Sequence, residues 1–143
     1  MDNLERARRL LEKNSFVTWI GIELEELETD RAVVHLEPDQ QHMNPYGIVH
    51  GGVYCTIADT VAGIAARTDG RDYVTQCSSM NFLRSQSEGT IRAEARVRHR
   101  GRSTCVVEAN VTGTGGKLLA TGTMTFFCLG TEHFTETKGR ESE

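Results

Sequence analysis

The spacing of apolar residues predicts a long buried helix near the middle of the chain. From Gly52 to Ala66, apolar side chains recur every three or four residues, which is the period of a helix. These side chains belong to Val53, Ile57, Val61 and Ile64. Most other positions in the run hold Ala, Thr, Cys or Gly. Because a helix that is apolar or small on every side is normally buried on every side, we expect this segment at the centre of the fold.

Alternating segments predict an antiparallel sheet around that helix. In the clearest one, one face holds Ile91, Ala93, Ala95, Val97 and His99, and the other holds Arg92, Glu94, Arg96, Arg98 and Arg100. Such a strand has one covered face and one wet face. Five further strands are expected over residues 20–28, 31–37, 73–84, 103–112 and 117–128. Short loops join the later strands, so we expect them to form a meander.

The N-terminal residues predict a second, amphipathic helix over residues 2–14, followed by a loop that Phe16 and Trp19 dock on the core. A chain of 143 residues suits a single domain with a real core. The element order predicts an α+β domain in which the sheet wraps around the long helix. We expect this domain over residues 1–130 and a polar, flexible tail over residues 131–143.

Asp59 is the one charged residue in the apolar helix. A buried carboxylate is costly unless something compensates it, and the helix positions three and four residues away offer no cation. Its partner must therefore come from a distant part of the fold, another subunit, water or a substrate. A structural Asp bonded to backbone or to a crossing Arg and a functional acid both fit this pattern.

Gly51 and Gly52 open the helix next to its unpaired N–H groups. Without side chains they allow a ligand close to that backbone, where a carbonyl oxygen would be polarised. Gly51 and Asp59 are eight residues apart, or about 12 Å along a helix axis. Both could not contact one reacting atom from one chain, so a site that uses both would most naturally span two subunits.

Other polar residues each have a functional and a structural interpretation. His50 could orient the loop or bind a carbonyl, or could simply bond to the backbone at the helix start, and Asn44 could be a site residue or an ordinary turn residue. Small side chains on one face of strand 73–84 could line a pocket or pack under the helix; they are Thr75, Cys77 and Ser79. The turn with Arg100, Gly101, Arg102 and Ser103 suits a phosphate, although a solvated hairpin tip is the commoner explanation.

Composition excludes several other classes of function. The net charge is −4 without a basic stripe, which argues against nucleic acid as a partner. No apolar run reaches the roughly 18 residues of a membrane span, and the N-terminus does not resemble a signal peptide. The four cysteines lie far apart, so we expect a cytoplasmic protein with reduced thiols. Neither metal-ligand spacing nor a nucleotide-binding motif occurs, so no metal or organic cofactor is expected.

Four segments together point to a family. They read N-P-Y-G-I-V-H-G-G, I-A-D-T, S-M-N-F-L-R and V-R-H-R-G-R-S, in this order along the chain. Over roughly residues 4–129 the chain resembles the hotdog-fold acyl-CoA thioesterases, in particular those of the phenylacetate-degradation type. One departure is Ser85, where relatives usually place Pro after F-L-R. The resemblance implies a hotdog fold, an antiparallel sheet around a long central helix.

The resemblance also implies roles for individual residues. Asp59 would act as the nucleophile or as the general base for water, and the Gly51 N–H of the other subunit would polarise the thioester carbonyl. His50 and Asn44 would orient substrate or water, and Thr75 would assist the water. The turn from Arg100 to Ser103 would hold the phosphates of coenzyme A.

We therefore expect an acyl-CoA thioesterase that works as a homodimer or as a dimer of dimers, with no cofactor. The acyl group stays open, since arylacetyl, hydroxybenzoyl-like and medium-chain acyl groups all suit a pocket lined by small side chains. The main alternative is a non-catalytic acyl-CoA-binding sensor or scaffold on the same fold, which would have no need for Asp59. A hydratase is a second alternative, but its arrangement of His and acid is not found here.

Overall fold

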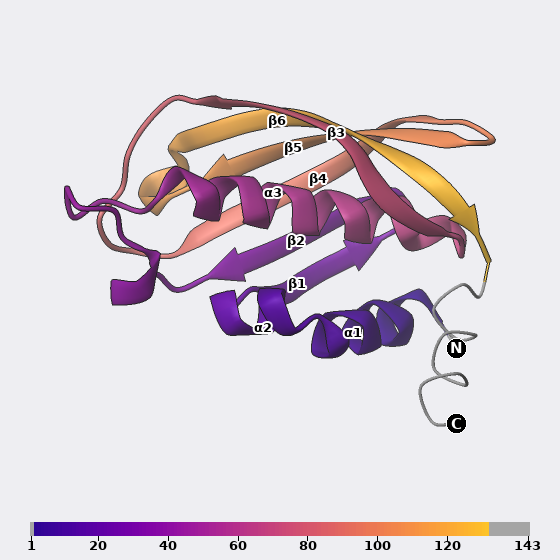
Figure 1. Cartoon of the computed structure of the whole chain (residues 1–143), viewed down its shortest axis with the longest axis horizontal. Helices are drawn as coiled ribbons and strands as arrows, with labels where there is room; N and C mark the ends of the chain where they lie inside the picture. Colours follow the sequence, from indigo (N-terminus) through magenta and orange to yellow (C-terminus); the bar gives the residue numbers. More distant parts are fainter. Residues whose placement is uncertain (1, 132–143) are drawn as a thin grey trace.

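The computed structural model describes residues 2–131, so nearly all of the predicted tail at 131–143 lies outside the described residues. A six-stranded antiparallel sheet curves around one long helix (Figure 1). The helices are α1 (Asn3–Lys13), α2 (Ser15–Ile20) and α3 (Gly51–Ala66). The strands are β1 (Glu23–Glu28), β2 (Arg31–Leu36), β3 (Asp72–Phe82), β4 (Ile91–Arg100), β5 (Thr104–Thr112) and β6 (Leu118–Gly130). The predicted α+β arrangement is therefore confirmed.

The strands lie in the order β1-β2-β4-β5-β6-β3. The meander predicted for the later strands is confirmed for β4, β5 and β6, which pair in sequence order. β3 precedes β4 in the sequence but pairs with β6 at the far edge of the sheet. The chain from α3 enters the sheet at this edge, so α3 and β3 lie next to each other beside an open edge strand (Figure 1).

The apolar stripe of α3 lies in the core, as the sequence predicts. Val53, Ile57, Val61 and Ile64 are all buried against the sheet. The prediction that the helix is buried on every side is wrong, because one face is only half-buried. This face carries small and polar side chains, namely Cys55, Thr56, Asp59 and Thr60. It faces the cavity described below.

The N-terminal segment folds differently from the prediction after α1. Asp2 caps α1 by accepting a hydrogen bond from the Glu5 N–H, and Asn14 ends it. Asn14 also caps α2, because its side chain accepts a hydrogen bond from the Val17 N–H at 3.2 Å. Residues 15–20 are therefore a second helix instead of the expected loop. This helix buries Val17 and Ile20, whereas Phe16 and Trp19 are 55% and 66% exposed, so the predicted docking of these two aromatic residues is wrong.

Two β-bulges change which side chains share a face. In β3 the pairing with β6 shifts between Thr75 and Cys77, so Gln76 is an extra residue in the strand. In β4 the pairing with β5 shifts between Val97 and His99. An extra residue reverses the alternation beyond it, because side chains of a strand have a period of two. Each bulge relocates residues that the sequence had assigned to a face.

The bulge in β4 corrects the prediction for the end of that strand. Ile91, Ala93 and Ala95 are fully buried, as expected from the alternation. Beyond the bulge, His99 is exposed instead of inward-facing, and Arg100 is part-buried and bonds to the end of α3 instead of pointing to solvent. In β3, the expected face of Thr75, Cys77 and Ser79 is likewise broken, and Thr75 shares its cavity with Ser78 instead.

Candidate active site

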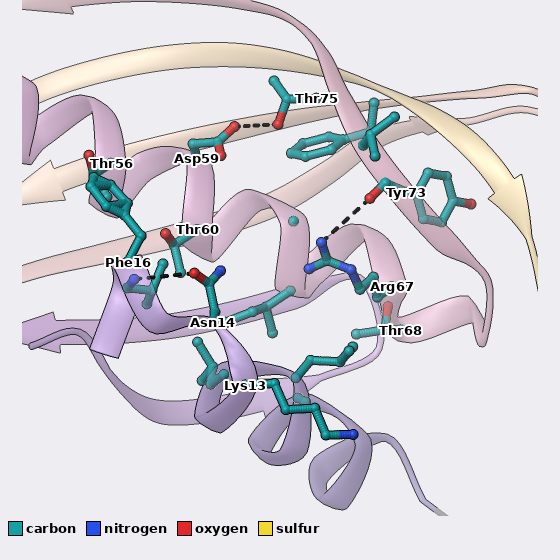
Figure 2. A pocket seen from close by; sticks show the side chains of 18 of the residues that line it. Lys13, Asn14, Phe16, Thr56, Asp59, Thr60, Arg67, Thr68, Tyr73 and Thr75 are labelled. Atoms are coloured by element: carbon teal, nitrogen blue, oxygen red, sulfur yellow. Dashed lines mark hydrogen bonds between the residues drawn. The ribbon is translucent and has the colours of Figure 1, made fainter. Parts of the chain in front are cut away.

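A cavity of about 1070 Å³ lies between α1, α2, α3 and β3 (Figure 2). Its lining is mostly apolar, with Phe16 and Val17 contributed by α2 and Ile64 by α3. Polar groups enter it mainly from the half-buried face of α3 and from β3. A large apolar cavity with a few convergent polar groups is the usual form of a small-molecule site.

Asp59 is the single acidic residue among the described residues that line this cavity. It projects from the middle of α3, and the Thr75 hydroxyl donates a hydrogen bond of 2.6 Å to its Oδ1 (Figure 2). Its Oδ2 has no hydrogen-bond partner among residues 2–131, and no Arg or Lys of that range forms an ion pair with it. The partner of Asp59 therefore comes from a distant part of the fold, one of the options left open by the sequence. One carboxylate oxygen is held in place and the other faces the cavity side of the helix.

Cys55 lies one helical turn before Asp59 and lines the same cavity. Burial raises the pKa of the Cys55 thiol, and the negative charge of Asp59 raises it further. Because the thiolate is the nucleophilic form of cysteine, a raised pKa makes Cys55 a poor nucleophile at neutral pH. Among the nearby groups, Asp59 is the better candidate for attack on a substrate or for activation of water.

The start of α3 presents an unpaired backbone donor. His50 is the N-cap, and its Nδ1 accepts a hydrogen bond of 2.8 Å from the Gly52 N–H. This is the backbone-bonded arrangement considered as the structural interpretation of His50. The Gly51 N–H has no acceptor within the part of the chain that the structure describes. A Cβ atom at Gly51 would lie 3.7 Å from the Phe82 ring, an ordinary contact, so the donor is accessible rather than enclosed.

Asn44 organises the loop that leads to His50. Its Oδ1 accepts hydrogen bonds from the backbone N–H groups of Tyr46, at 2.9 Å, and Ile48, at 3.3 Å. The Asn44 N–H in turn donates to the Ile48 carbonyl at 2.8 Å. The amide thus supports the turn conformation, in line with its interpretation as a turn residue. It holds the segment that presents the first N–H groups of α3.

The predicted site residues fall into three groups along α3. Asp59 and Thr75 meet at its middle, whereas His50, Gly51 and Asn44 lie at its N-terminal end. Because α3 is continuous from Gly51 to Ala66, the two groups are separated by about 12 Å along its axis. One chain therefore does not bring Asp59 and the Gly51 N–H to a common atom.

The turn predicted to bind phosphates lies at the other end of α3, where Arg100 has internal partners. Its guanidinium donates to the Ala66 carbonyl at 2.8 Å and to Asp30 Oδ1 at 2.7 Å, and pairs with Asp69 at 2.8 Å. It also donates to the Tyr73 hydroxyl at 3.1 Å. Burial alone would lower the pKa of Arg100, but the hydrogen bond to Asp30 and nearby negative groups raise it. Every nitrogen of Arg100 is engaged in this way.

The other residues of this turn remain open to solvent. Arg102 and Ser103 are exposed, and their side chains have no hydrogen-bond partner among the described residues. The backbone of the turn is fixed by Arg71, which donates to the Gly101 carbonyl at 3.0 Å and to the Arg102 carbonyl at 2.8 Å. Arg100 thus anchors the turn from below, and Arg102 and Ser103 are the groups that a ligand could reach.

Sequence reasoning missed one charged residue of the cavity, Arg67 (Figure 2). It follows Asp59 by eight residues and Gly63 by four, so the three positions lie on one stripe of the helix. This spacing was the available signal. Among residues 2–131, no three His, Cys, Asp or Glu side chains are grouped as metal ligands. None of the described helices is long and apolar enough to cross a bilayer.

Comparison with known proteins identifies the family. The model of the thioesterase superfamily matches residues 46–120, which is more than half of the chain. A 1,4-dihydroxy-2-naphthoyl-CoA hydrolase of Listeria monocytogenes is 37% identical over 103 residues, which cover 70% of this chain and 84% of that protein. The chain therefore belongs to the thioesterase superfamily, and it is a thioester hydrolase.

Solved structures confirm the hotdog fold. The PaaI protein of the Escherichia coli phenylacetic acid degradation operon superposes with a TM-score of 0.86 at 25% identity, covering 90% of this chain and 94% of that one. A hypothetical thioesterase of Streptococcus pneumoniae, solved with coenzyme A, gives a TM-score of 0.74 at 29% identity, covering 78% and 88%. The resemblance to thioesterases of the PaaI type that was read from the sequence motifs is thus confirmed.

Proposed function

We propose that this enzyme hydrolyses the thioester bond of acyl-CoA substrates, releasing a free acid and coenzyme A, with Asp59 as nucleophile or general base. The observation that carries this proposal is the single acid of a mostly apolar cavity, held by Thr75 through one oxygen only. The names of the relatives, a naphthoyl-CoA hydrolase and a thioesterase solved with coenzyme A, support acyl-CoA as the substrate class.

Two courses of reaction are open to Asp59. As a general base, it takes a proton from water while the water oxygen bonds to the carbonyl carbon; the C–S bond then breaks and the sulfur leaves as a thiol after protonation. As a nucleophile, its Oδ2 bonds to the carbonyl carbon, coenzyme A leaves, and water then hydrolyses the acyl-aspartate anhydride. In both courses Thr75 fixes Oδ1, and its hydroxyl lies close enough to help orient the water.

The Gly51 N–H of a second copy of the chain is the proposed donor to the carbonyl oxygen. The separation of about 12 Å along α3 argues against a site within one chain. His50 and Asn44 support this role as positioning residues, because His50 binds the neighbouring Gly52 N–H and leaves that of Gly51 open. A preformed N–H aimed at the developing oxyanion lowers the barrier most in a site that excludes water.

A homodimer joined along β3, alone or doubled as a dimer of dimers, would supply that second copy. β3 has 11 residues and ends the sheet, paired with β6 on one side only within the described residues. A long exposed edge strand is a ready partner for another strand, and natural proteins rarely leave one uncovered. Because α3 and β3 are adjacent, pairing through β3 would bring the site of one chain toward the helix of its partner.

Arg102 and Ser103, with the backbone of Gly101, are the proposed contacts of the coenzyme A phosphates. Arg102 is exposed and Ser103 offers a hydroxyl beside it. Arg100 shapes this site indirectly, because its guanidinium is engaged at the end of α3. A guanidinium on a fixed turn suits a phosphate, which it can bind through two parallel hydrogen bonds.

The experiment that tests this function is thiol release from a panel of acyl-CoA esters by wild type and Asp59→Asn. The substitution keeps the shape of the side chain and an oxygen that can accept from Thr75. We expect kcat to fall by about 10²–10⁴-fold, the typical contribution of a positioned acid–base group. Cys55→Ala is the matched control on the same helix face, and it should retain turnover.

Either result decides the proposal. Turnover of some esters that disappears in Asp59→Asn supports the function, and a burst of thiol equal to the enzyme concentration would identify Asp59 as a nucleophile. No thiol release from any ester, with acyl-CoA binding retained, would reject catalysis and leave a binding module on the same fold.

A further inference from the structure

Arg67 is a charged residue of the cavity that the proposed mechanism does not use. It directly follows α3, and its side chain turns back along the helix instead of continuing away from it (Figure 2). A Cβ atom at Gly63 would lie 3.1 Å from Arg67 Nη1, so the missing side chain at Gly63 makes room for the guanidinium. The guanidinium therefore lies one helical turn beyond Asp59, on the same side of α3.

The hydrogen bonding of this guanidinium is incomplete. Nη2 donates one long hydrogen bond, of 3.5 Å, to the Tyr73 carbonyl. Nε is inaccessible to solvent and has no acceptor, and Nη1 has none among residues 2–131. No carboxylate of that range lies within ion-pair distance of Arg67. A buried guanidinium without a counter-ion is expensive, so its presence in a cavity calls for an explanation.

A structural role as the cation at the C-terminus of a helix does not account for Arg67. Such a residue would bind the last carbonyls of α3. Those carbonyls already have a donor, since Arg100 binds Ala66 at 2.8 Å and Ala65 at 3.3 Å. The side chain of Arg67 points the other way, toward Gly63 and the cavity. The helix end is therefore complete without it.

The charges around Arg67 leave it available for an anion. Burial lowers the pKa of Arg67, the charge of Asp72 raises it, and Arg6 lowers it again. Asp72 forms its ion pair with Arg6, which also lines the cavity. Arginine nevertheless stays charged in proteins. Lys13 is a further cation of the lining, so positive charge predominates at this part of the cavity and Asp59 is the one acid facing it.

We propose that Arg67 binds a carboxylate at the far end of the acyl group, so that the preferred substrates are coenzyme A thioesters of dicarboxylic acids. The inference rests on the proposed function, which places the thioester carbon at Asp59. Asp59 and Gly63 are separated by about 6 Å along the helix. An extended chain gains about 1.2 Å per bond, so a carboxyl carbon five bonds away covers this distance. The expected acyl group therefore has about six carbons, as in adipyl-CoA.

The test compares adipyl-CoA with hexanoyl-CoA, which has the same length but no second carboxylate. We expect wild type to favour adipyl-CoA in kcat/KM by about 10²-fold, because a site built for a polar group discriminates strongly against its absence. In Arg67→Met this preference should vanish, with hexanoyl-CoA turned over as well as before or better. Arg67→Lys, which keeps the charge, should restore part of the preference, and Arg98→Met removes an equal charge from the outer sheet face as a control.

The outcomes separate this inference from the proposed function. Turnover of hexanoyl-CoA equal to or faster than that of adipyl-CoA would overturn the dicarboxylic preference and leave the thioesterase intact. If no ester is hydrolysed, calorimetry with the non-hydrolysable thioether analogues of both still decides, since only tighter binding of the adipyl analogue that is lost in Arg67→Met supports the site. A large fall in Tm of Arg67→Met with unchanged selectivity would show a purely structural residue and overturn the inference.

Discussion

The two ends of α3 differ in how completely their polar groups are paired. At the C-terminal end, Arg100 binds the carbonyls of Ala65 and Ala66, and Arg6 binds that of Arg67 at 2.9 Å. At the N-terminal end, His50 binds the Gly52 N–H, but the Gly51 N–H finds no acceptor among the described residues. Both ends of a helix carry unpaired backbone groups that something must satisfy.

This difference assigns different work to the two ends. A fully paired end contributes to stability, because breaking it would leave buried polar groups without partners. An end with an open donor contributes little to stability but can bind a ligand that carries negative charge. Substitutions at the N-terminal end should therefore change activity without changing stability, and substitutions at the C-terminal end should do the reverse.

Gly51→Pro gives the largest expected effect, because it removes the open donor from the N-terminal end. Proline is well tolerated at the first position of a helix, and the preceding residue His50 already has φ −62° and ψ 138°, which suits a residue before proline. We expect kcat to fall by about 10²–10³-fold, the cost of one oxyanion donor, with Tm nearly unchanged. Gly51→Ala keeps the N–H and meets Phe82 only at 3.7 Å, so it should retain activity.

Mixing two inactive variants tests whether the donor comes from a partner chain. In a dimer of one Asp59→Asn and one Gly51→Pro chain, a shared site would pair the intact Asp59 of one with the intact Gly51 of the other. Random reassociation of equal amounts should then restore about a quarter of the wild-type activity, since half of the dimers are mixed and each has one good site. No recovery in dimers that have exchanged chains would place both groups of a site in the same chain.

Arg100→Met and Arg102→Met compare the two arginines of the β4–β5 turn. Arg100→Met leaves Asp30, Asp69 and two carbonyls short of a donor, so we expect a loss of about 2–3 kcal/mol in the free energy of unfolding, measured in urea. Its KM for acyl-CoA should stay unchanged. Arg102→Met should leave stability unchanged and raise that KM about fivefold, in line with one exposed ionic contact.

Acyl-pantetheine esters provide the control for this pair, because they lack the nucleotide phosphates. Arg102→Met should have the wild-type KM with them. A rise in KM for acyl-CoA in Arg100→Met, without loss of stability, would contradict the comparison and return the phosphate role to Arg100.

The helical part of the site was predictable from sequence because the period of a helix survives along its whole length. The spacing of Val53, Ile57 and Val61 fixed the core face of α3, and Asp59 was visible as a charge in an apolar run. Its bond to Thr75 could be inferred only from the family resemblance, since residues 16 apart in sequence carry no local signal of contact.

The strand part was less predictable, because a single extra residue reverses every later side chain. Neither Gln76 nor Arg98, the extra residues at the two bulges, is a glycine or proline that would mark an irregularity. The reversal turned Arg100 from the solvent face to the end of α3 and so changed its expected role. Arg67 was missed for another reason, because its significance depends on the absence of partners, which no sequence pattern reveals.

Asp69→Asn gives the smallest expected effect, a change in how stability depends on pH at the paired end of α3. Burial opposes ionisation of Asp69, but hydrogen bonds from Tyr73 and Arg71 outweigh it and lower its pKa. The carboxylate therefore stabilises the fold fully above its unfolded pKa, about 3.9, and this contribution is lost as pH falls through the lower folded value. The wild-type advantage in free energy of unfolding, about 1 kcal/mol at pH 7, should shrink below about pH 4.

Urea titrations of wild type and Asp69→Asn between neutral and acid pH measure this change. Tyr73→Phe sharpens the test, because the Tyr73 hydroxyl donates to Asp69 Oδ2 at 2.6 Å and its removal brings the Asp69 pKa closer to the ordinary value. The acid-sensitive part of the stability should accordingly be smaller in Tyr73→Phe than in wild type. Parallel curves for all three proteins would mean that pairing at this end of α3 does not depend on the Asp69 charge, and the contrast between the two helix ends would then rest on Arg100 alone.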